Sequence, residues 1–389
     1  MKSGLKIGLF LLCLCTVLAV LTACGKEEES YPEASFGLAF VSNGDGTCEV
    51  SGIGRCTDTD VVIPSKSPAG DRVTSIRSKA FYDNENLTSV VIPNSVTDIK
   101  YGAFWGCENL TSVVLPKGLT KIEERTFFDC YELTSVVIPS GVTVIDYYAF
   151  ADCAALTSIT IPDSVTSIGD SAFSSCYNLT SISIPKNVTK IGKDAFVGCH
   201  NLTSITVAKG NSVYRSSGDC LIETASKTLL LGSNSSVIPT DGSVTKIADK
   251  AFISCKGLTF LSIPEGVLSI GEKAFINCTG LTSVVIPNSV TSIGESAFSY
   301  CSGLTTVYLG SGVKRIEEAT FMSCTDLTSI TVPSGVTSIE GVAMWGCSKL
   351  TSITYQGTKA EWNAISKGSN WNANTGNYTV RCSDGDLSN

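Results

Sequence analysis

Cysteine is the residue type whose chemistry most needs an explanation in this chain. The 389-residue sequence has 17 Cys and a single His, His200. Many of the cysteines recur every 23 residues, in two series: Cys107, Cys130, Cys153, Cys176 and Cys199, then Cys255, Cys278, Cys301, Cys324 and Cys347. A metal site needs further ligands at fixed offsets, and no C-x-x-C pair or second ligand type accompanies them. We interpret the series as one buried column of small apolar side chains, with no metal site.

The only His follows Cys199 directly, which raises the question of a Cys–His pair. Such a pair needs both groups within hydrogen-bond reach on a preorganised site, and adjacent residues at a turn normally diverge. The sequence also contains no G-x-S-x-G elbow and no Gly-rich phosphate loop outside the repeat period. We therefore predict no enzymatic activity, no cofactor and no small-molecule substrate.

The cysteines outside the column need separate interpretations. Cys48 and Cys56 lie near the N-terminus of a chain that we expect to be exported. A disulfide between them is plausible there, with free thiols as the alternative. Cys220 and Cys382 have no assigned role.

The start of the chain predicts export and lipidation. A positively charged start precedes an apolar run from Ile7 to Leu21, which is too short for a comfortable membrane span. The sequence Leu21-Thr22-Ala23-Cys24 resembles a bacterial lipobox. We predict a signal peptide over 1–23, lipidation of Cys24 and a flexible tether over 24–35. The alternative is an ordinary cleaved signal followed by a chance Cys.

The elements that must position the cysteine column come from a 23-residue repeat. The same period places an aromatic residue in each copy, with Met344 in the last slot: Phe81, Phe104, Phe127, Phe150, Phe173, Phe196, Phe252, Phe275, Phe298 and Phe321. The spacing from Phe196 to Phe252 is 56, or 23 + 33, so one coil carries an insertion. Stacked repeats of this length bury one continuous core.

Each repeat position has a physical reason. In residues 281–287, alternation directs Val284 and Ile286 to one face and Val285 to the other, which predicts a short strand. Residues 290–294 predict a second short extended segment that ends at a glycine. Residues 296–301 predict a helical turn that places the aromatic residue in the core.

These repeats resemble the BspA-like leucine-rich repeats of bacterial surface proteins over residues 73–353. The resemblance implies an arc-shaped solenoid of short parallel strands and helical turns, with LRR blocks at 73–207 and 244–353. It also implies a β-type N-terminal cap at 36–72 and a C-terminal cap and tail at 354–389. By resemblance, the family consists of adhesins and binders of host or matrix proteins, with no catalytic residues to carry over.

The insertion, residues 208–243, departs from the repeat. Two apolar runs around Thr224-Ala-Ser-Lys227 predict a β-hairpin. Inserts in solenoids often lie on the binding face. The alternative is a structural joint between the two repeat blocks.

Two surfaces are candidates for ligand binding. The outward strand face is mostly Ser and Thr, but Phe260, Tyr308 and Val285 interrupt it, and exposed aromatics are favoured interface anchors. The second candidate is the column directly after the core aromatic, which holds Tyr82, Trp105 and Phe128 in three consecutive coils. For this column, packing is the alternative to binding.

Charge and composition narrow the partners. A formal net charge of −8 argues against nucleic acid, which calls for basic patches. We predict a lipid-anchored, extracytoplasmic protein at the cell membrane or cell surface, attached to the membrane by its lipid anchor only, that binds proteins as an adhesion module. The alternatives are a structural cell-envelope protein without a ligand and a polysaccharide-binding accessory lipoprotein.

Overall fold

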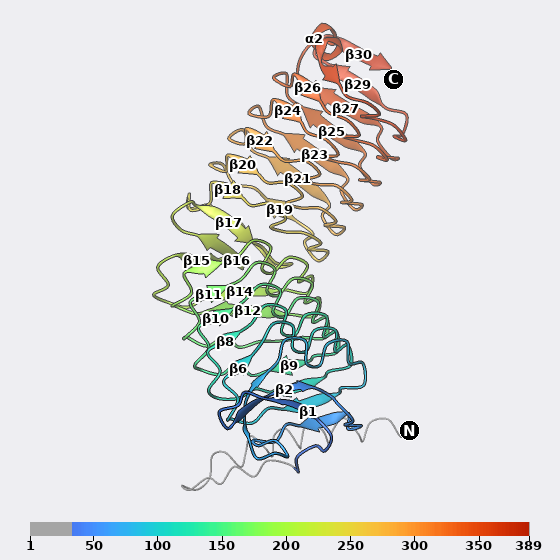
Figure 1. The fold of residues 1–389 in the computed structure, drawn as a ribbon. Coiled ribbons are helices and arrows are strands. Elements are labelled where there is room, and N and C mark those ends of the chain that lie inside the picture. Colours follow the sequence, from blue (N-terminus) through green and yellow to red (C-terminus); the bar gives the residue numbers. More distant parts are fainter. Residues whose placement is uncertain (1–32, 389) are drawn as a thin grey trace, which may run out of the picture. The chain divides into compact units, whose positions relative to one another are not determined.

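The computed structural model describes residues 33–388. The predicted signal peptide, Cys24 and most of the predicted tether lie outside these residues. The chain divides into two units, 1–34 and 35–389, and every element below belongs to the second unit. This unit is a solenoid in which coil follows coil along the sequence (Figure 1).

Most 23-residue coils contribute one strand to each of two sides of the solenoid. The first side contains β3 (Asp60–Val62), β5 (Ser89–Val91), β7 (Ser112–Val114), β9 (Ser135–Val136), β12 (Ser181–Ile184), β14 (Ser204–Val207), β19 (Leu261–Ser262), β21 (Ser283–Ile286), β23 (Thr306–Leu309), β25 (Ser329–Val332) and β27 (Ser352–Tyr355). Paired strands of this side run in parallel, and from β5 on their facing residues are 23 apart, as with Ser283 and Thr306. The predicted parallel solenoid is confirmed.

The second side has shorter strands. They are β4 (Arg72–Ile76), β6 (Asp98–Ile99), β8 (Lys121–Ile122), β10 (Val144–Ile145), β11 (Ser167–Ile168), β13 (Lys190–Ile191), β18 (Lys246–Ile247), β20 (Ser269–Ile270), β22 (Ser292–Ile293), β24 (Arg315–Ile316), β26 (Ser338–Ile339) and β28 (Ser366–Lys367). Most of them bury their Ile. Ile191 of β13 is only partly buried, and β28 aligns Lys367 with the Ile column. The two sides together enclose the core.

The period-two alternation of the long strands separates core from solvent. In β21, Val284 and Ile286 are buried whereas Val285 is 56% exposed. A short strand can serve both faces because successive side chains point to opposite sides of the sheet. The face that the sequence assigned to the core is therefore the buried one.

The helical turns that we expected in each coil are not confirmed. Residues 295–300 form consecutive β-turns, in which the amides of Ala297 and Ser299 donate within the coil. The intervening amides of Ser296, Phe298 and Tyr300 donate instead to carbonyls of the next coil. Ser296 and Tyr300 have positive φ angles of 55° and 59°. This left-handed backbone turns alternate amides outward, which a right-handed helix cannot do.

The Phe and Cys columns stack inside these turns. Core Phe rings of adjacent coils lie nearly parallel, with centroids 5.4 Å apart for Phe150 and Phe173 and for Phe173 and Phe196. The thiols of most column cysteines donate to the carbonyl of the Phe 26 residues earlier, as from Cys153 to Phe127 at 3.2 Å. The cysteine column is therefore buried and hydrogen-bonded.

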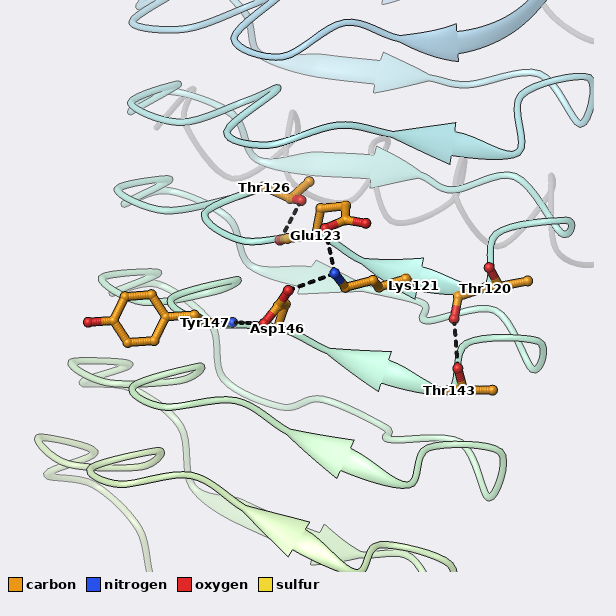
Figure 2. Close-up of polar contacts among 7 residues, drawn as sticks. All are labelled: Thr120, Lys121, Glu123, Thr126, Thr143, Asp146 and Tyr147. Atoms are coloured by element: carbon orange, nitrogen blue, oxygen red, sulfur yellow. Dashed lines mark hydrogen bonds and ion pairs between the residues drawn. The ribbon is translucent and has the colours of Figure 1, made fainter.

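Polar contacts also connect adjacent coils at the surface (Figure 2). The Lys121 ammonium lies 2.6 Å from Glu123 Oε2 in its own coil and 2.7 Å from Asp146 Oδ2 in the next coil. Burial opposes charge on Lys121, but hydrogen bonds to Asp146 and Glu123 prevail and raise its pKa. The Thr143 hydroxyl donates to the Thr120 carbonyl at 3.2 Å.

The insertion holds three antiparallel strands, β15 (Tyr214–Ser217), β16 (Cys220–Glu223) and β17 (Thr228–Leu231). β17 then pairs in parallel with β18, so the hairpin leads into the second block. Side chains of β16 divide between two hydrophobic clusters, with Leu221 in the first and Cys220 and Ile222 in the second. The core is therefore split at this hairpin.

Both ends of the solenoid carry antiparallel strands. At the N-terminal end, β1 (Ala39–Ser42) pairs with β2 (Thr47–Gly52), which pairs in parallel with β4. At the C-terminal end, α2 (Lys359–Ala364) begins with a capping box of Thr358 and Glu361. There, β29 (Thr379–Cys382) pairs with β30 (Gly385–Ser388). That these segments act as caps stays a prediction.

Thiol reactivity tests the buried column. Burial raises the pKa of Cys107 and Cys301 to about 12, so little reactive thiolate forms at pH 8. We expect iodoacetamide to alkylate the half-buried Cys382 at least about 100-fold faster than these two thiols. Peptide mass spectrometry of native and guanidinium-denatured protein measures both rates. Equal native rates would contradict a buried column.

Candidate ligand-binding surfaces

The outward face of the second block brings together three of the predicted binding residues. Phe260, Val285 and Tyr308 are 69%, 56% and 41% exposed. Val285 is the register partner of Tyr308 and of Ser262, and Phe260 precedes Ser262 by two residues on the same face. We call these three residues the sheet-face patch.

The surroundings make this patch distinct. The neighbouring outward positions are small and polar: Ser283, Thr306, Ser329, Thr331, Ser352 and Thr354. The Tyr308 hydroxyl accepts a hydrogen bond from Gln356 Nε2 at 3.4 Å, which holds one edge of the ring. The patch therefore offers two aromatic rings and a Val on a neutral sheet.

The second predicted surface also comes together, as a packed row of rings that we call the aromatic ridge. The Tyr82 and Trp105 ring centroids are 5.1 Å apart, and those of Trp105 and Phe128 are 5.5 Å apart. The row continues from Phe128 to Tyr148 at 5.5 Å and on to Tyr147 at 4.1 Å. Tyr82 is 45% exposed, whereas Trp105 and Phe128 are half-buried.

Two cations that sequence reasoning missed lie on the ridge. The Lys79 ammonium is 5.1 Å from the Tyr82 centroid and 5.0 Å from that of Trp105. The Arg125 guanidinium is 5.6 Å from the Trp105 centroid. Both cations occupy the repeat position two residues before the core Phe, which is the signal that could have revealed them. Cation–π contacts of this kind stabilise the ridge internally.

The polar groups of the ridge are also satisfied internally. Trp105 Nε1 donates to Asp129 Oδ2 at 3.3 Å, and Arg125 donates to the Tyr101 hydroxyl at 3.1 Å. A surface whose donors already have partners gives up those contacts when it binds a ligand. The geometry therefore favours packing for the ridge and leaves the sheet-face patch as the stronger candidate.

Cys199 and His200 are not arranged as a catalytic pair. The Cys199 thiol donates to the Phe173 carbonyl at 3.2 Å, whereas the His200 ring stacks on Tyr177 with centroids 5.2 Å apart. Burial and, to a lesser extent, the Lys256 ammonium lower the pKa of His200. Within residues 33–388, no hydrogen bond joins the two side chains.

The remaining candidate chemistry concerns cysteines and metals. Cys48 and Cys56 are both buried, and the Cys48 thiol lies 3.6 Å from the Asp71 carbonyl. A disulfide between them stays a prediction. Among the described residues, no group of three His, Cys, Asp or Glu side chains could hold a metal ion. In the same part of the chain, no helix is long and apolar enough to cross a membrane.

Stability measurements distinguish the two surfaces. We expect Trp105→Ala to lower the free energy of unfolding by about 2 kcal/mol, less than the roughly 3–5 kcal/mol of a fully buried ring. Phe260→Ala should change it by less than about 0.5 kcal/mol, because its exposed ring loses little packing. Urea titration followed by circular dichroism measures both. A Trp105→Ala variant as stable as the wild type would argue against packing.

The fold matches known bacterial repeat proteins. A leucine-rich cell surface protein from Faecalibacterium prausnitzii is 30% identical, with a TM-score of 0.69 over 88% of this chain and 99% of that chain. A leucine-rich repeat protein from Bacteroides ovatus is 27% identical, with a TM-score of 0.55 over 90% of this chain and all of that chain. The pneumococcal vaccine antigen PcpA shares the fold at 18% identity, with a TM-score of 0.63 over 88% of this chain and 97% of that chain.

Sequence comparison agrees with the structural one. The family described as "BspA type Leucine rich repeat region" matches residues 74–203, 120–240 and 245–369, in 6 copies. No curated protein matches the chain. Because the matched residues cover most of the sequence and follow the coils described above, the chain belongs to the BspA-type leucine-rich repeat family.

Proposed function

We propose that this protein is a surface-exposed bacterial lipoprotein that binds a protein ligand through the sheet-face patch. The observation that carries the proposal is the exposure of Phe260, Val285 and Tyr308 on adjacent coils of the second block, where the neighbouring outward positions are small and polar. Large apolar side chains at such positions do not contribute to the solenoid core. Interface energy in proteins commonly concentrates in a few aromatic anchors of this kind.

The family and its neighbours support a binding role over an enzymatic one. The Faecalibacterium prausnitzii relative is described as a leucine-rich cell surface protein. A repeat scaffold fixes the shape of a surface, and specificity resides in the side chains displayed on it. We therefore propose adhesion without catalysis.

The mechanism that we propose combines a rigid face with many copies. The parallel ladders hold the outward strands in register, so a ligand does not have to pay for ordering the surface that it meets. Lipid anchoring through Cys24 would place many copies on one membrane. Weak contacts then add up through multivalency.

The patch can be tested with a matched pair of substitutions. Val285→Asp places a charge in the centre of the patch, whereas Val137→Asp makes the same change in the same column of the first block. Val137 is 72% exposed, so both changes should be tolerated by the fold. We expect Val285→Asp to weaken binding to immobilised matrix proteins at least about tenfold, or 1.4 kcal/mol, and Val137→Asp to leave it unchanged.

The outcomes separate the alternatives. Equal binding by the two variants would show that the ligand does not bind at the sheet-face patch. No binding by the wild type to any protein, together with binding to a glycan array, would favour the polysaccharide-accessory role. A deletion strain with normal adhesion and a leaky envelope would favour the structural role.

Lipid anchoring is tested at Cys24. We expect Cys24→Ser to move the protein from the membrane fraction to the soluble fraction, because Ser has no thiol to carry a diacylglyceryl group through a thioether. Metabolic labelling with radioactive palmitate should mark the wild type and not the Cys24→Ser variant. Cys382→Ser serves as the control, and labelling of the Cys24→Ser variant would contradict the assignment.

A further inference from the structure

The turns of the solenoid form a continuous ladder. We call the six-residue turn of each coil a rung. In each rung, three alternate amides donate to carbonyls of the next rung, as from Ser171, Phe173 and Ser175 to Lys193, Ala195 and Val197. The same pattern recurs from the rung of Lys79 to the rung of Gly346.

The ladder is interrupted at one place among the described rungs. Within residues 33–388, no group accepts a hydrogen bond from the amides of Asp194, Phe196 or Gly198. Phe196 is only 3% exposed. The amide of a residue as buried as Phe196 normally has a partner, because an unpaired donor away from water costs free energy.

The sequence explains the interruption. Leu229 pairs in register with Ile247 and so occupies the position of Ile168 in a regular coil. Nine residues separate Leu229 from Pro239, whereas sixteen separate Ile168 from Pro185. Although the joint coil is longer than a regular coil, its segment after Leu229 is therefore too short to build a rung. The Cys255 contact agrees with the missing rung. The preceding coil offers no core Phe carbonyl to this thiol, whose Sγ lies 4.0 Å from the Gly232 carbonyl oxygen instead.

A cavity of about 310 Å³ occupies this part of the joint. Its lining includes Phe196, Val197, Leu221, Leu231, Ala248 and Lys250. The volume is about twice that of a 150 Å³ cavity lined by Leu, Ile and Phe that binds benzene. It has room for an aromatic ring and the backbone next to it.

The rung that follows the cavity complements the rung that precedes it. The carbonyls of Asp249 and Ile253 occupy the acceptor positions of a regular rung, yet no described residue donates to them. Between them, the Ala251 carbonyl accepts from the Gly232 amide at 2.8 Å. Gly232 fits there because a side chain would collide with the Phe252 ring. Donors thus lie on one side and acceptors on the other.

Charge at the cavity is balanced. The Lys250 ammonium lies 2.6 Å from Asp194 Oδ2, joining the two blocks, and Lys193 and Asp249 also line the space. A free anion or cation would meet an opposite and a like charge together. A neutral ligand with alternating acceptors and donors fits better.

We propose that the joint cavity binds a rung-like turn segment of a partner polypeptide that carries an aromatic side chain. Carbonyls of the segment accept from the amides of Asp194, Phe196 and Gly198, and its amides donate toward the opposite wall. Its aromatic ring continues the Phe173–Phe196 stack. In regular coils alternate amides of one rung pair with alternate carbonyls of the next rung, as from Ser171 to Lys193, so a segment with the same turns matches these donors. A purely apolar molecule would leave these amides unpaired.

The test uses a peptide copied from a regular rung of this chain. The probe is a fluorescein-labelled peptide with the sequence of residues 169–178 and Cys176→Ser. The control peptide also carries Phe173→Asp. We expect the full-length protein to bind the first peptide saturably in fluorescence anisotropy and the control at least about tenfold more weakly. Hydrogen exchange at Asp194, Phe196 and Gly198 should slow when the first peptide is bound.

A pair of protein variants locates the site. Val197→Trp narrows the cavity and should weaken peptide binding at least about tenfold. Ile276→Trp makes a similar change in the same column, away from the cavity, and should have no effect. The column accepts Trp, since Trp105 and Trp345 occupy it. Circular dichroism confirms that both variants fold.

The proposal fails if the first peptide does not bind, if both peptides bind equally, or if the three amides exchange at the same rate with and without peptide. Equal binding by the two Trp variants would also overturn it. The cavity shares no residue with the sheet-face patch. The peptide experiment and the Val285→Asp experiment can therefore fail independently of each other.

Discussion

The alternation of hydrogen bonds within the rungs is the constraint on which the structure depends. One amide closes a turn inside its coil, and the next amide reaches the neighbouring coil, as Ser299 and Phe298 do. This alternation fixes the distance between coils. The same distance suits parallel strands and stacked Phe rings, with centroids 4.8 Å apart for Phe252 and Phe275 and 5.7 Å for Phe298 and Phe321. Strands, rings and thiols therefore repeat together.

Because the amide ladder, the Phe stack and the thiol contacts share one period, a change in one coil at the joint affects all three. When the segment after the short strand cannot build its rung, the amide ladder, the Phe stack and the thiol contact are all interrupted together. The hairpin of β15, β16 and β17 bridges the two hydrophobic clusters there, since alternate side chains of β16 reach each of them. Backbone groups that are paired in regular coils are left open beside a cavity.

The outward face obeys different rules. Its side chains do not take part in the ladder or the core, so Val285 and Ser283 can differ from their neighbours without disturbing the coil. The aromatic ridge is intermediate, because Trp105 contacts Tyr82, Phe128 and two cations while staying half-buried. Outward side chains can vary without destabilising the fold, and for this reason the specificity of a repeat protein resides on such faces.

The 23-residue spacing by itself determined the solenoid, the buried Phe and Cys columns and the outward position of Phe260, Val285 and Tyr308. These follow from periodicity because a repeated side-chain pattern has to be buried or exposed in the same way in every coil. The conformation of the turns did not follow, since a helical turn and a run of β-turns place the core Phe equally well. Only the tertiary structure decided the turn conformation. Positive φ at positions such as Ser296 is stabilised by the neighbouring coil, whose carbonyls accept hydrogen bonds from these amides. For the same reason, only the folded chain shows that the amides of Asp194, Phe196 and Gly198 lack such a neighbour.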